Sequence, residues 1–163
     1  MRENWLLLVV LCSFCGSVAA NEIRLGVSNA TAGPASRLGL DLNTGAELYF
    51  NSQYFKQLLP QHSVTLVKYD DGYEPDNTLY NTKRLLGQDV LALFNYVGTP
   101  TSKSVMATVK LHAIPFITPF TGADFLRRPD ATNIYNLRAS YEQEAKAQMA
   151  YLIERLKFKR IAI

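Results

Sequence analysis

The sequence predicts an α/β fold in which a parallel β-sheet carries helices on both faces. After Asn21, short apolar segments alternate strictly with longer segments whose apolar residues recur at helical spacing. The segment 90–94 is apolar at every position, which is typical of a strand buried on both faces, as in parallel sheets. Together these patterns predict one open sheet built from successive strand–helix units.

The predicted strands are short and rich in apolar residues. They are residues 23–27, 64–69, 90–94, 114–118 and 133–137, and residues 160–163 begin a further strand. The chain therefore stops inside an apolar strand, whereas chain termini usually lie at the surface. We expect the sequence to be an incomplete part of a longer protein.

The predicted helices lie between these strands, at residues 36–56, 75–87, 102–112 and 142–156. Pro75 and Gly87 bound the second helix, in the positions where proline favours a helix start and glycine a helix end. The helix 142–156 has the clearest amphipathic pattern. Its apolar face consists of Ala145, Met149, Leu152, Ile153 and Leu156.

Residues 1–20 have the pattern of a secretory signal peptide. An apolar run from Trp5 to Phe14 is followed by small residues, and Ala20 allows cleavage before Asn21. The run is too short for a membrane-spanning helix. Both cysteines, Cys12 and Cys15, lie within this segment, so a redox CxxC motif is a poor explanation for them. We expect an exported, periplasmic chain that has no thiol chemistry after processing.

Composition and motifs exclude several classes of function. A net charge of +3 is too small and too scattered to favour nucleic-acid binding. The sequence lacks the glycine-rich loops of nucleotide sites, a nucleophile elbow and the cysteine–histidine spacing of metal sites. Asp70-Asp71 could hold a metal, but the residues that follow are typical of a turn into a capped helix. His62 and His112 are expected to be solvated. We therefore expect no cofactor, no metal and no enzymatic activity.

Three loops at the predicted carboxyl ends of strands share one composition. Residues 28–36, 96–102 and 118–123 combine hydroxyl side chains with small residues, and each loop precedes a predicted helix. Ligands of open parallel sheets bind at this edge, and helix N-termini offer unpaired N–H groups to anions such as carboxylates. Serine and threonine are also ordinary helix caps, so the prediction of a ligand site rests on the convergence of the three loops.

At this point the sequence resembles a known family. The segments that carry the resemblance are Ile23-Arg-Leu-Gly-Val27, Thr31-Ala-Gly-Pro-Ala35, residues 66–76, residues 94–102 and Ile114-Pro-Phe-Ile-Thr-Pro-Phe-Thr-Gly-Ala123, ending near residues 136–140. In this order they resemble the type I periplasmic binding proteins of the branched-chain amino acid (Leu/Ile/Val) receptor family, the substrate-binding proteins of ABC transporters. One departure is the stretch 54–62, where members of the family often carry a Gly-Gly-x-x-Gly turn.

The resemblance implies two α/β lobes that close on a ligand. Residues 21–139 would form the N-terminal part of the first lobe, and residues 140–163 would begin the second. Two loops would hold the α-carboxylate and α-amino groups of an amino-acid-like ligand, and the first loop would line the pocket near the ligand's side chain. The ligand-binding residues expected on this basis are Thr99, Thr101, Ser102, Phe120, Thr121, Gly122, Ala123, Ser36 and Arg37.

Three functions remain open on the sequence. The first is a periplasmic solute-binding protein, monomeric when complete, which delivers a small amino-acid-like or amide-like ligand to the membrane permease of an ABC transporter. The second is the extracellular ligand-sensing domain of a transmembrane signalling protein. The third is an exported α/β enzyme, which no visible constellation of nucleophile, base or metal ligands supports.

Overall fold

The computed structural model describes residues 21–162, and the predicted signal peptide lies outside this range. It contains a sheet of five parallel strands in the order β2-β1-β3-β4-β5. The strands are β1 (Asn21–Asn29), β2 (His62–Asp70), β3 (Ala92–Phe94), β4 (Phe116–Ile117) and β5 (Ile134–Tyr135). β1 and β2 pair over their whole length, from Asn21 opposite His62 to Asn29 opposite Asp70. The predicted fold class is confirmed.

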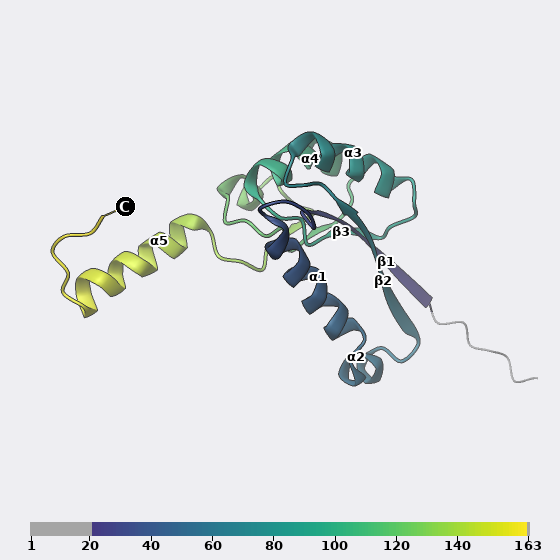
Figure 1. The fold of residues 1–163 in the computed structure, drawn as a ribbon, viewed down its shortest axis with the longest axis horizontal. Coiled ribbons are helices and arrows are strands. Elements are labelled where there is room, and N and C mark those ends of the chain that lie inside the picture. Colours follow the sequence, from purple (N-terminus) through teal and green to yellow (C-terminus); the bar gives the residue numbers. More distant parts are fainter. Residues whose placement is uncertain (1–20, 163) are drawn as a thin grey trace, which may run out of the picture.

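Helices cover both faces of this sheet. The elements are α1 (Ser36–Phe50), α2 (Gln53–Leu58), α3 (Pro75–Leu86), α4 (Thr99–Leu111), the 3₁₀-helix η2 (Asp124–Arg127), α5 (Tyr141–Ala150) and the π-helical turn η3 (Tyr151–Arg155). Figure 1 shows α3 and α4 on one face and α1 on the other, with α5 leading away from the sheet.

The main core lies between the sheet and the pair α3–α4. Its buried members include Leu85 from α3, Leu93 from β3 and Val105 from α4. The rings of Tyr96 and Phe116 meet edge to face with their centroids 5.1 Å apart. Within this core the phenol of Tyr96 forms a hydrogen bond of 2.9 Å with the Thr82 hydroxyl. This packing fixes the ends of β3 and β4, from which the candidate site is built.

The predicted helix 36–56 is two helices, so that prediction is wrong in its middle. Asn51 ends α1, with its side-chain amide donating to the carbonyl of Glu47 at 2.9 Å. Ser52 then caps α2, because its hydroxyl accepts from the Phe55 amide at 3.1 Å. Both side chains bond to nearby backbone, which is how asparagine and serine compete with helix continuation.

The C-terminal segment differs more from the prediction. A helix begins at Tyr141 behind a capping box formed by Ser140 and Gln143, but the last turn, 151–155, is π-helical. The expected apolar face is mostly exposed, and only Met149 and Leu152 are half-buried. Residues 160–162 form no strand, because this part of the chain lies far from the sheet and has no strand beside it to pair with (Figure 1).

Candidate functional site

The ends of β3 and β4 hold two loops side by side. The loop after β3 and the loop after β4 are joined by a parallel bridge between Val97 and Phe120, and the Phe120 amide donates to the Tyr96 carbonyl at 2.7 Å. α4 begins directly after Gly98, whose φ of 104° and close contact with the ring of Tyr73 leave no room for a side chain. The N-terminus of α4 therefore faces the loop after β4.

A hydroxyl cluster forms where these loops meet the chain segment that leads into α5. It consists of Thr99, Thr121 and Tyr141. The two threonine hydroxyls are 2.7 Å apart, and the Tyr141 phenol lies 3.1 Å from that of Thr121 and 3.4 Å from that of Thr99. Thr121 is fully buried and Thr99 is half-buried. Three groups that each donate and accept a hydrogen bond are thus gathered at the carboxyl edge of the sheet.

Tyr141 is the member of this cluster that the sequence did not point to. Its backbone amide donates to the Gly122 carbonyl at 2.9 Å, and a Cβ added at Gly122 would lie 2.5 Å from its ring. The hydrogen bonds to Thr121 and Thr99 lower the pKa of the Tyr141 phenol. The only signal in the sequence was its position, one residue after the serine that caps the helix.

Thr101 and Ser102 are buried in the first turns of α4, and neither hydroxyl takes part in the hydrogen bonds of the cluster. The Thr101 hydroxyl donates to the carbonyls of Gly98, at 3.0 Å, and of Val97, so it stabilises the loop. The Ser102 hydroxyl is buried and has no hydrogen-bond partner within residues 21–162. Of the expected α4 residues, Thr99 presents its hydroxyl to the cluster and Ser102 has hydrogen-bonding capacity left over.

The residues of the loop after β4 take different positions. Phe120 is half-buried and Ala123 is buried, and the Ala123 amide donates to the Thr121 hydroxyl at 3.2 Å. Gly122 is buried against Tyr141. The predicted residues Thr99, Thr121, Gly122 and Ala123 are therefore brought together, with Phe120 beside them.

Ser36 and Arg37 lie on α1, and no hydrogen bond among the described residues links either to the hydroxyl cluster. The Arg37 side chain is 87% exposed and forms an ion pair of 2.8 Å with Asp41, one turn along the same helix. The Ser36 amide donates to the Gly33 carbonyl in the turn before α1. Among residues 21–162, the hydrogen bonds and ion pairs of these two residues are made within α1 and the turn before it.

Two arginines tie the site to the segment that leads into α5. The Arg138 guanidinium lies 5.2 Å from the ring centroids of both Phe120 and Tyr141 and makes a two-pronged ion pair with Glu144, at 2.8 and 2.9 Å. The guanidinium of Arg127 donates to the carbonyls of Ala123, Arg138 and Ala139. The loop after β4 and residues 138–141 are thereby held in one arrangement.

A buried polar network centred on Asp71 holds the start of the first loop, residues 28–36, through Ser28. The Asp71 carboxylate accepts from the hydroxyls of Ser28 and Thr78, both at 3.0 Å, and from the Tyr73 amide at 2.9 Å. Burial raises the pKa of Asp71, although these hydrogen bonds oppose the rise. Its oxygens are occupied within the fold. Over residues 21–162 there is no group of three or more acidic, histidine or cysteine residues arranged to hold a metal ion.

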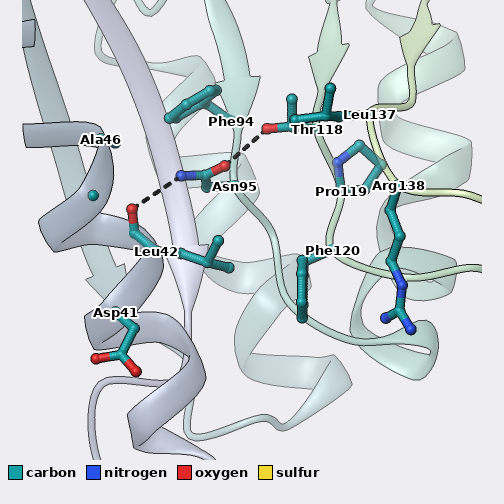
Figure 2. A pocket seen from close by; sticks show the side chains of 11 residues that line it. Asp41, Leu42, Ala46, Phe94, Asn95, Thr118, Pro119, Phe120, Leu137 and Arg138 are labelled. Carbon is teal, nitrogen blue, oxygen red and sulfur yellow. Dashed lines mark hydrogen bonds between the residues drawn. The ribbon is translucent and has the colours of Figure 1, made fainter. Parts of the chain in front are cut away.

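A cavity of about 490 Å³ lies between α1 and the ends of β3 and β4. Figure 2 shows Phe94 and Phe120 beside it, and Asn95 in its lining, where its side-chain amide donates to the Leu42 carbonyl at 3.4 Å. The Thr118 hydroxyl donates to the other end of the Asn95 amide at 2.8 Å. The wall is mostly apolar. Phe120 lines this cavity and directly precedes Thr121 of the hydroxyl cluster.

The chain is similar to known proteins in sequence and in fold. The Leu/Ile/Val-binding protein of Escherichia coli (strain K12) is 21% identical over 154 residues, which cover 94% of this chain and 42% of that protein. A possible leucine/isoleucine/valine-binding protein from Rhodopirellula baltica SH 1 is 35% identical with a TM-score of 0.78, covering 86% of this chain and 38% of that one.

A further solved structure is similar over the same region. An ABC transporter solute binding protein from R. palustris, in complex with benzoate, is 26% identical with a TM-score of 0.73, covering 82% of this chain and 37% of that one. The chain thus spans about two fifths of the length of these relatives. It also matches the family described as periplasmic binding protein over residues 22–163. This match confirms the resemblance seen in the sequence: the chain belongs to the periplasmic binding protein family.

Proposed function

We propose that this chain carries one wall of the ligand site of a periplasmic solute-binding protein. The protein would capture a small amino-acid-like or amide-like molecule and deliver it to the membrane permease of an ABC transporter. The observation that carries the proposal is the hydroxyl cluster of Thr99, Thr121 and Tyr141, at the edge of the sheet where open α/β folds bind ligands.

The cluster suits a ligand carboxylate or amide. The first turn of α4 has N–H groups without partners inside the helix, and its dipole favours negative charge. Pro100 has no N–H, so the amides of Thr99 and Thr101 are those available. The hydroxyls of Thr99 and Thr121 add donors that carry no charge. An anionic group at this edge would therefore be held by hydrogen bonds, without a counter-ion that must be desolvated.

The apolar cavity beside Phe120 supports a ligand with an apolar portion. Residues 21–139 form the sheet and its covering helices, and α5 leads away from them (Figure 1). In our proposal these residues are the first lobe, residues from 140 onward begin the second, and closure of the two lobes completes the pocket. Residues 1–20 would direct the protein to the periplasm, where it would act as a monomer without catalysis. Within residues 21–162, no helix has the length and apolar character needed to cross a bilayer.

Ligand-induced thermal stabilisation of the full-length gene product tests the proposal. The panel would contain branched-chain and other amino acids, their amides, and aromatic carboxylates such as benzoate. A bound ligand at about 100 times its Kd stabilises a protein by about 2.7 kcal/mol, so we expect a clear rise in Tm for one class of compound. A panel that leaves Tm unchanged throughout would contradict the proposal.

A further inference from the structure

A second surface runs along α4, outside the candidate site. It is a groove of about 630 Å³ between α4 and the segment from η2 to β5, and we call it the α4 groove. Its floor is apolar and consists of Met106, Phe125 and Ile134, which are half-buried because they pack against the main core. None of the expected ligand-binding residues lines it.

The rim of the α4 groove is strongly basic. Lys103 and Lys110 stand on the α4 side and Arg128 on the other, whereas Asp130 is the one acidic residue of the lining. All three cations are exposed, and none forms an ion pair with another residue between 21 and 162. A partly apolar groove edged by three such cations is complementary to an apolar side chain flanked by carboxylates.

Both walls of the α4 groove are held in place. The side-chain amide of Asn133 donates to the carbonyls of Val109 and Ile114, at 3.3 and 2.6 Å, which joins the far wall to the end of α4. Asn136 donates to the Leu126 carbonyl at 2.8 Å. The groove therefore exists before any partner binds, and binding does not require it to be ordered first.

The spacing of the cations indicates the size of the partner. Lys103 and Lys110 are seven residues apart on one face of α4, which corresponds to about 10 Å along the helix axis. A single small carboxylate does not reach across this distance and to Arg128 as well. A helical or extended peptide with several carboxylates does. We propose that the α4 groove binds an acidic, amphipathic segment of a partner protein.

Fluorescence anisotropy with the full-length protein tests this proposal. The probe is a labelled helical peptide with a stripe of leucines flanked by glutamates, and its twin has glutamine at every glutamate. We expect saturable binding of the glutamate peptide, weakening as salt rises. The double variant Lys103→Glu with Lys110→Glu should weaken binding at least tenfold, and so should Arg128→Glu on the other wall. The matched control is Lys83→Glu, an exposed lysine in the last turn of α3, which should leave binding unchanged.

Several results would overturn the proposal. They are no saturable binding, equal binding of the glutamine twin, or unchanged binding by both groove variants. Binding of the groove to phosphatidylglycerol vesicles without binding of the peptide would also overturn it, in favour of a membrane surface. The amino-acid panel is run on every variant, and its outcome there tests the proposed function separately, because the variants lie outside the ligand site.

Discussion

Tyr141 joins the hydroxyl cluster to the start of α5. Its phenol contacts both threonine hydroxyls, while its amide donates to the Gly122 carbonyl. In the proposed function, this one side chain would link the ligand wall to α5.

Tyr141→Phe should weaken ligand binding modestly. The two threonine hydroxyls lie 2.7 Å apart and keep their hydrogen bond to one another. The variant therefore loses only the hydrogen bonds of the phenol. We expect a loss of about 0.5–1.5 kcal/mol in binding free energy, measured by calorimetric titration of the full-length protein. Tyr80→Phe, at an exposed tyrosine on α3, is the control. A loss as large as that of removing Thr121's hydroxyl would argue against this division of roles.

Asp70 supplies a pH-dependent contribution to stability. Its carboxylate accepts from the amides of Thr31 and Ala32, at 2.6 and 3.2 Å, and from that of Gly72. These bonds lower the pKa of Asp70 in the folded state. A lowered pKa means that the folded form binds the proton less tightly than the unfolded form. The stabilisation is therefore present above the unfolded pKa of about 3.9 and is lost as pH falls through the lower folded value.

Asp70→Asn should accordingly lower Tm at pH 7, and the difference from the parent should shrink as pH falls below about 4. Asp89→Asn, at an exposed position on the turn after α3, should leave Tm nearly unchanged at both values. Thermal unfolding at the two pH values measures this. A constant difference between parent and Asp70→Asn across the range would show that the carboxylate's charge is not the cause.

Gly122 and Gly45 differ in whether the fold leaves room for a side chain. A Cβ at Gly122 would lie 2.7 Å from the backbone nitrogen of Tyr141, whereas Gly45, within α1, has nothing within 4 Å. Gly122→Ala should push α5 away from the loop after β4, lowering stability and weakening ligand binding. Gly45→Ala should raise stability by roughly 0.5–1 kcal/mol, because alanine favours a helix interior.

Denaturant unfolding together with ligand titration of both variants checks this pair. Equal effects of the two substitutions would mean that the contact between Gly122 and Tyr141 does not constrain the segment. A gain in stability from Gly122→Ala would contradict the geometry outright.

The sequence predicted helices and strands well where a local pattern of residues determines them. It failed where contacts with distant parts of the chain determine them. The parallel sheet with helices on both faces follows from strand–helix alternation, and the start of α3 at Pro75 was marked by the residue itself. The strand expected at 160–163 was wrong over 160–162 because a strand requires a neighbour, which no local pattern supplies. The predicted strand 90–94 is shorter than expected, and Leu91 is 63% exposed, since it precedes the paired residues.

The residues of the candidate site also differ in whether a local sequence pattern could predict them. The loops containing Thr99 and Thr121 were predictable because each follows a strand, but the helix predicted to start at residue 102 begins at Thr99, since Pro100 suits the first turn of a helix. Tyr141 was not, because it reaches the loops through the turn of residues 136–140, which no periodicity encodes. The exposed position of Arg37 could be read from the sequence, since Arg37 and Asp41 lie one turn apart on a predicted helix and pair there.

At the scale of the whole molecule, the described part of the chain exposes a large apolar area. Leu48, Leu111 and Leu137 are 70%, 81% and 85% exposed. The chain also spans about two fifths of the length of its relatives. Residues 21–163 produced alone should therefore self-associate and bind an apolar dye such as ANS. Sedimentation and dye fluorescence test this, and a monodisperse species without dye binding would be the contrary result.

If the hydroxyl cluster binds the ligand, as we propose, removing the hydroxyl of Thr121 in the full-length protein must weaken binding, and Thr121→Val is the variant to measure. Calorimetric titration with the compound found in the thermal panel should show binding weakened by about 1–3 kcal/mol, because a buried partner loses its hydrogen bond. Thr65→Val, at an exposed threonine of β2, should bind the compound like the parent. If Thr121→Val binds it as tightly as the parent, the ligand site lies elsewhere.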